Sequence, residues 1–175
     1  MNKREKKVAI ITNYIGNVSN SWPVYSYGKI PETRAANACS TYAGAVHPKD
    51  VLGLVDISIS GNGKKGLLFT EYYVYYNNGF FGNQGKVSYK EVNESGTIPS
   101  ALFDAAYNRQ ALIELVSALA YIEGGTVQAT INSLDESIAG ATDKVRSVSD
   151  TISKAADFVN ALADLFGGGN GTTGK

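Results

Sequence analysis

Residues Val51 to Val92 read VLGLVDISISGNGKKGLLFTEYYVYYNNGFFGNQGKVSYKEV and are the part of the chain that looks like a β core. The first segment, Val51 to Ile59, is almost continuously apolar, which is typical of a strand covered on both faces. A buried helix is the alternative that the apolar run alone leaves open. Gly61-Asn62-Gly63 follows, and its glycines supply the positive φ angles that a tight turn requires.

The rest of the stretch predicts more short strands separated by turns. Leu67 to Phe69 and Tyr72 to Tyr76 are rich in aromatic and other apolar residues. Asn77-Asn78-Gly79 is the strongest hairpin signal, because Asn and Gly both tolerate positive φ. Gly82 to Gly85 predicts a second turn, and Val87 to Tyr89 predicts a returning strand. Four or five short strands joined by hairpins indicate an antiparallel meander.

Three segments of this stretch resemble, in order, a pleckstrin-homology-like (PH-like) module of bacterial proteins. They are Val51 to Asp56, Gly66 to Thr70 and Val87 to Val92, and the resemblance covers roughly residues 30 to 122. The chain departs from the pattern at Glu71-Tyr72, where Asp and Gly are expected. The resemblance implies a small α+β fold with a partly open β barrel and a closing helix. It also implies a binding or scaffolding role without catalytic residues.

Composition limits the classes of protein to which the chain can belong. It has 175 residues, a formal net charge of zero and 18% charged residues, which argues against nucleic-acid binding through a basic surface. With one Cys no internal disulfide forms, and no apolar run reaches the roughly 18 residues of a membrane span. The apolar run near the N-terminus is too short for a signal peptide. We therefore expect a cytoplasmic protein of a bacterium or a phage.

The chain divides into four predicted parts. Residues 1–7 form a disordered basic terminus, 8–123 an α+β domain, 124–166 a heptad helix, and 167–175 a flexible tail. Within the domain, Val8 to Ile11 suggests an edge strand, and Trp22 is expected to pack on the β core from a loop. Pro31 to Ala43 and Ala101 to Ile122 are predicted helices, with a polar connector over Glu91 to Pro99.

A regular heptad pattern of apolar residues begins at Val127. The repeat continues without interruption to Phe166, while an acidic row from Glu136 to Asp164 recurs every seven residues on the opposite face. The predicted interface residues of this helix are Ile131, Leu134, Ile138, Val145, Val148, Ile152, Val159, Leu162 and Phe166.

Three arrangements of the heptad segment compete. The helix self-assembles or docks on a partner helix, it folds back on the helix at 101–122 as a hairpin, or it lies on a membrane surface. The acidic row disfavours the membrane arrangement, because anionic lipid repels it. We expect self-assembly, because the predicted β domain is too small to cover an apolar stripe about 60 Å long.

Few residues suggest chemistry. Gly63, Lys64 and Lys65, in the motif GNGKKG, form a candidate anion-binding loop, and a solvated hairpin is the alternative. Tyr73 and Tyr75 could form an exposed contact patch or ordinary cross-strand pairs. Cys39 and the single His, His47, are expected to be structural. No catalytic set, metal site or cofactor motif is found in the sequence, so we expect a non-enzymatic interaction module, with a phosphate or small-molecule sensor as the alternative.

Overall fold

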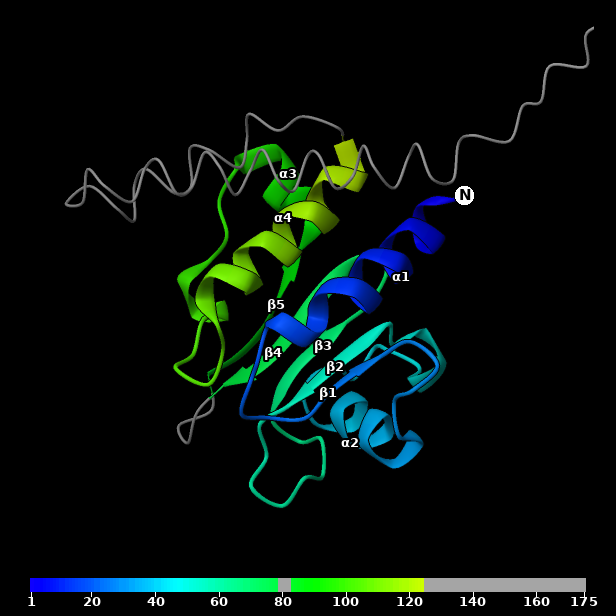
Figure 1. The fold of residues 1–175 in the computed structure, drawn as a ribbon, viewed down its shortest axis with the longest axis vertical. Helices are drawn as coiled ribbons and strands as arrows, with labels where there is room; N and C mark the ends of the chain where they lie inside the picture. The colour runs from blue at the N-terminus through cyan, green and yellow to red at the C-terminus, as the bar shows by residue number, and fades with distance from the viewer. Residues whose placement is uncertain (79–82, 125–175) are drawn as a thin grey trace, which may run out of the picture.

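The computed structural model describes residues 1–78 and 83–124 and shows an α+β fold built on one antiparallel sheet. Within these residues, five strands lie side by side in chain order, as Figure 1 shows. The predicted antiparallel meander is therefore confirmed. The strands are β1 (Val24–Ser26), β2 (Gly53–Asp56), β3 (Gly66–Phe69), β4 (Tyr73–Asn78) and β5 (Asn83–Ser88).

Helices cover both faces of the sheet. On one face, α1 (Lys3–Tyr14) and α4 (Arg109–Gly124) lie side by side, and α3 (Tyr89–Ser95) packs against α4 (Figure 1). On the other face lies α2 (Glu32–Tyr42), close to the predicted helix Pro31 to Ala43. Short 3₁₀ helices at Ile15–Asn17, Pro48–Asp50 and Ser100–Leu102 complete the connections.

The central strands β2, β3 and β4 alternate between two cores. Leu54, Leu68 and Tyr75 face α2, whereas their neighbours Val55 and Phe69 face the core beneath α1 and α4. This alternation follows from the two-residue period of a strand. Every residue of β2 and β3 is buried, which explains the nearly continuous apolar sequence from Val51 onward. The prediction of a strand covered on both faces is confirmed, although β2 itself is shorter.

The N-terminal residues form a helix, so the predictions of a disordered terminus at 1–7 and of an edge strand at 8–11 were wrong. The helix α1 begins with a capping box, in which the Asn2 side chain accepts the N–H of Glu5 at 2.8 Å. The Glu5 carboxylate accepts the N–H of Asn2 at 2.9 Å in return. Ile10 and Ile11 are buried against the sheet. Burial of this apolar face outweighs the high charge of the first turn.

Two further elements differ from the sequence-based expectation. The predicted polar connector at 91–99 is largely α3, which begins where the Ser88 hydroxyl accepts the N–H of Glu91 at 3.4 Å. This helix ends at Gly96, whose φ of +68° is the left-handed conformation typical of a helix end. The helix α4, the last one within the described residues, begins at Arg109 rather than at Ala101.

The two predicted turns around the β4–β5 hairpin were misplaced. Asn77 pairs with Gln84 and Asn78 pairs with Asn83, so these residues belong to the strands. The connection between the strands, residues 79–82, lies outside the described part of the chain. The heptad segment at 127–166 and the predicted flexible tail at 167–175 also lie outside it, and their helical and interface assignments remain predictions.

Candidate binding site at the loop between β2 and β3

Asp56, the last residue of β2, organises the loop that follows it. Its carboxylate is fully buried, and its Oδ1 accepts the N–H of Ser58 at 3.0 Å together with the Ser58 hydroxyl. Its Oδ2 accepts the N–H of Gly63 at 3.1 Å and lies 3.3 Å from a guanidinium nitrogen of Arg34 on α2. Asp56 therefore satisfies the glycine turn that follows β2, and these contacts supply the partners that a buried carboxylate requires.

The backbone donors of the glycine loop have partners within the loop. Gly61 donates to the Ser58 carbonyl at 2.9 Å, and Asn62 donates to the Ser58 hydroxyl at 2.8 Å. Lys64 donates to the Asn62 side-chain oxygen at 3.0 Å, and Gly63 donates to Asp56. An anion bound at GNGKKG would therefore depend on the lysine side chains rather than on a backbone nest of N–H groups.

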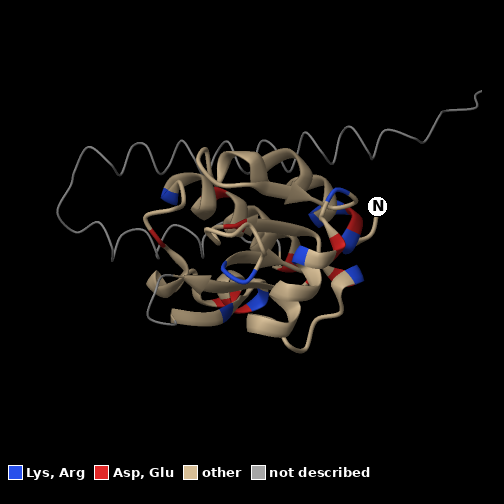
Figure 2. Ribbon diagram, turned by 90° about the horizontal axis from the view of Figure 1, so that it is seen from below, with Lys and Arg blue, Asp and Glu red and all other residues tan. Residues whose placement is uncertain are grey.

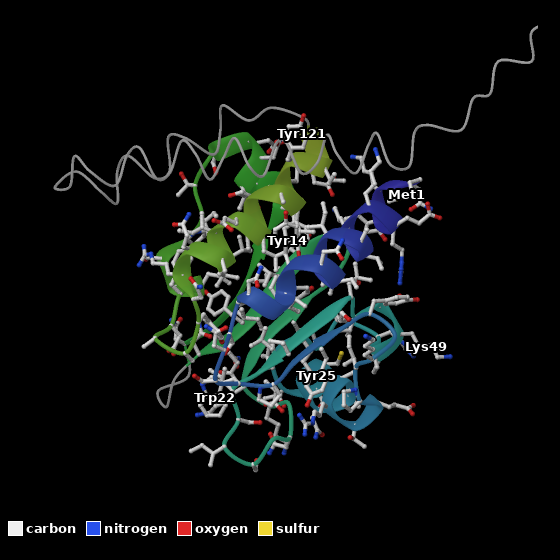
Figure 3. The ribbon with its side chains drawn as sticks, viewed as in Figure 1. Met1, Tyr14, Trp22, Tyr25, Lys49 and Tyr121 are labelled. Atoms are coloured by element: carbon white, nitrogen blue, oxygen red, sulfur yellow. The ribbon has the colours of Figure 1, made fainter. Side chains whose placement is uncertain are left out.

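A cavity of about 720 Å³ lies beside this loop. Lys64 and Lys65 line it together with Ile57 and Ile59 of the same loop. Trp22 joins them from the segment before β1, at the end of the molecule where the loop projects (Figure 3). Trp22 also packs against the core, as predicted.

The cavity has one acidic wall as well as the basic one. Asp104 and Ala106, which precede α4 in the sequence, also line the cavity. The Asp104 carboxylate accepts the N–H of Ala106 at 2.9 Å. In Figure 2 the Lys and Arg segments are interspersed with Asp and Glu segments along the ribbon. The positive charge of Lys64 and Lys65 is therefore local to this site.

Sequence reasoning found the lysines of this site but missed its other walls. Trp22, Ile59 and Asp104 come from three segments that only the fold brings together. The one available signal was Ile59, an apolar residue in the last position before a polar turn, which is 86% exposed in the structure. A large aliphatic side chain left in water beside two lysines is the kind of feature that marks a contact surface.

The predicted tyrosine patch is not an exposed surface. Tyr75 is buried beneath α2, and Tyr73 on the same face is half-buried, with its ring 5.8 Å from that of Tyr75. The expectation of an exposed pair was therefore wrong for Tyr75, because α2 covers the face on which both residues lie. The exposed residue of the group is Tyr72, at the turn before β4.

Cys39 and His47 have the structural roles that the sequence suggested. Cys39 is buried on the inner face of α2, and burial, followed by the nearby charge of Asp50, raises the pKa of its thiol. This disfavours the nucleophilic thiolate. The ring of His47 accepts the N–H of Lys49 at 3.2 Å. Among residues 1–78 and 83–124, no group of three His, Cys, Asp or Glu side chains is placed to hold a metal ion.

A second polar cluster, which the sequence did not reveal, joins α1 to the end of α4. Lys7 is fully buried, donates to the Glu123 carboxylate and the Glu71 carbonyl, and lies 5.0 Å from the Tyr89 ring centre. Lys3 also pairs with Glu123, at 3.2 Å. Burial raises the pKa of Glu123, but hydrogen bonds and charges from both lysines outweigh it and hold that pKa below its usual value. Because its charged groups pair with one another, we regard this cluster as structural.

Comparisons with protein-family models, with curated proteins and with solved structures found no match for this chain. Within the described residues, none of the helices combines the length and the apolar character needed to cross a membrane.

Proposed function

We propose that this protein is a non-enzymatic interaction module that self-assembles through its heptad segment at 127–166. A helix of a second copy, or of another protein that presents the same apolar seam, is the partner that this pattern fits. In this proposal the heptad segments form the assembly, and each of them carries one folded domain at 1–124.

The observation that supports self-assembly is the burial of the apolar face of α4. Leu112, Leu115 and Leu119 are fully buried and belong to one core cluster with Phe69 and Val74 of the sheet. A hairpin in which the heptad segment packs on this stripe would compete with the sheet for it. Since the sheet already occupies it, the twelve apolar positions from Val127 to Phe166 require another surface.

The PH-like resemblance belongs to this proposal too. It implies a meander that forms a partly open barrel closed by a helix. The order of β1 to β5 followed by α4 agrees with the meander and the helix, whereas the sheet of the described residues is open. Modules of that kind bind and scaffold, which agrees with an assembly role. A cytoplasmic location is part of the same proposal, because the single thiol of Cys39 is buried and forms no disulfide.

The test places charges on the seam and compares them with the same charges beside it. In one variant, Ile138→Asp and Ile152→Asp introduce two carboxylates at core positions of the heptads. The control carries Ala139→Asp and Ser153→Asp, each one residue later and off the seam. We expect light scattering to give 18.6 kDa for the seam variant and a multiple of that mass for the control and the natural chain. A seam variant with the mass of the natural chain would contradict the proposal.

A further inference from the structure

The cavity beside the β2–β3 loop has a rigid frame. Asp56 and Ser58 hold the backbone of the loop from within, and the side chain of Asn77 on β4 donates to the Lys64 carbonyl at 2.8 Å. A methyl group on Gly63 would come within 2.6 Å of the Arg34 carbonyl, so the loop is seated directly on α2. The backbone of the loop wall is therefore held in place by contacts within the protein.

The side chains that face the cavity divide into an apolar and a cationic set. Trp22, Ile57 and Ile59 supply the apolar wall, while the ammonium groups of Lys64 and Lys65 stand on the same loop. Lys64 is exposed and Lys65 is half-buried. Asp104 is the one carboxylate among the lining residues, so the lysines outnumber it and the lining carries a net positive charge.

This combination excludes a small inorganic anion as the fitting ligand. Tight phosphate sites use several backbone N–H groups, and those of residues 61–64 already donate within the loop. Two lysines at a water-filled surface bind a free ion only weakly. The apolar wall can contribute more binding free energy, above all through Ile59, whose side chain is 86% exposed and would be buried by a ligand.

We propose that this cavity binds an organic anion with an apolar body, such as a medium-chain carboxylate. The body would cover Ile59 and Trp22, and the carboxylate would pair with the ammonium group of Lys64 or Lys65. A volume of about 720 Å³ accommodates a ligand of this size, since small-molecule sites measure about 300–1,000 Å³. The proposal concerns the folded domain and is independent of how the heptad segment assembles.

Trp22 provides a direct reporter, because it is the single Trp of the chain and lines the cavity. The full chain is titrated with octanoate, with acetate, which has the charge without the body, and with 1-octanol, which has the body without the charge. We expect octanoate to change Trp22 fluorescence saturably. Acetate should have no effect, and 1-octanol should bind more weakly than octanoate.

Two variants and a control assign the response to the site. Lys64→Gln with Lys65→Gln should weaken octanoate binding about tenfold, the effect of losing one charge-assisted contact. Ile59→Ser should weaken both octanoate and 1-octanol. Lys49→Gln with Lys90→Gln removes two exposed lysines outside the cavity lining and should leave binding unchanged. All the exchanged side chains are exposed or half-buried, so the variants should fold, which circular dichroism checks.

Three results would overturn the proposal. They are an equal response to acetate and octanoate, unchanged octanoate binding by the Lys64 and Lys65 variant, and no fluorescence response to octanoate at all. In the last case, phosphatidylglycerol vesicles are added to the same chain. Co-sedimentation that depends on Ile59 would then identify the loop as a membrane contact instead of a small-molecule site.

Discussion

Two buried tyrosines differ in what their hydroxyl groups contact. The Tyr107 hydroxyl donates to the side-chain oxygen of Asn78 at 2.7 Å, and Asn78 in turn donates to the carbonyls of Ala101 and Leu102. The hydroxyl of Tyr42, the last residue of α2, is buried without a hydrogen-bond partner in the described part of the chain. Burial raises the pKa of both groups, so both are neutral donors at physiological pH.

The same substitution should therefore have opposite effects at these two positions. We expect Tyr107→Phe to destabilise the fold by about 1–2 kcal/mol, because it removes a hydrogen bond and leaves a buried acceptor short of a partner. Tyr42→Phe should be neutral or stabilise by up to about 1 kcal/mol, because it removes a buried hydroxyl without a partner. Urea unfolding of the two variants measures both values. A greater loss of stability for Tyr42→Phe would contradict this account.

The entry into β3 depends on one glycine. Gly66 has φ +134°, and a Cβ atom built there would lie 1.8 Å from the Val55 carbonyl oxygen of the neighbouring strand. No side chain fits that space without separating β2 from β3. Gly16, in the 3₁₀ helix after α1, has nothing within 4 Å of the same added atom.

An alanine exchange at each glycine tests this contact. Gly66→Ala should cost at least about 3 kcal/mol of unfolding free energy, since it combines backbone strain with a backbone clash. Gly16→Ala should change stability by no more than about 0.5–1 kcal/mol, and in the stabilising direction. Thermal unfolding compares the two variants. Equal melting temperatures would show that β3 enters the sheet differently.

The junction of α1 with α4 should make stability depend on pH. The folded-state pKa of Glu123 lies below its usual value of 4.5, so its ionised form stabilises the fold above that pH. The contribution should disappear as pH falls from about 4.5 through the lower, folded-state pKa. The natural chain should therefore exceed Glu123→Gln in stability at pH 7 and approach it at low pH, as urea unfolding at several pH values would reveal. A difference that grows as pH falls would have the wrong sign.

The elements that the sequence predicted correctly are those with a strong local signal. Apolar β2, the Gly61–Gly63 turn and α2 were found because period and glycine placement suffice for them. The first helix was missed because Val8 to Ile11 is rich in β-branched residues, although the Asn2–Glu5 capping pair was readable. The third helix was missed although Ser88 and Glu91 have the spacing of a helix start.

The binding site was less predictable than the fold. Lys64 and Lys65 stood out as charges in a glycine loop, but Trp22 and Asp104 reach the cavity only through long-range packing. The buried Lys7 was unpredictable for the same reason, because its partners Glu71 and Glu123 are distant in sequence. Local patterns specify strands and turns, whereas tertiary packing decides which side chains share a cavity.

The described residues form a sheet covered on both faces, and the heptad pattern of the sequence follows α4. The first and last described helices, α1 and α4, are joined by the Lys3–Glu123 and Lys7–Glu123 ion pairs. These pairs hold the N-terminal helix against the end of α4, just before the heptad segment in the sequence. Both cores are formed by residues between Ile10 and Ala120. We therefore expect residues 1–124 to fold without the rest of the chain.

The most direct test compares the solution mass of the full chain with that of a chain ending at Gly124, by light scattering on a sizing column. We expect a folded monomer for the shorter chain and an oligomer, at a whole multiple of 18.6 kDa, for the full chain. Circular dichroism confirms that the shorter chain is folded. Two monomers of these lengths would contradict self-assembly through the heptad segment.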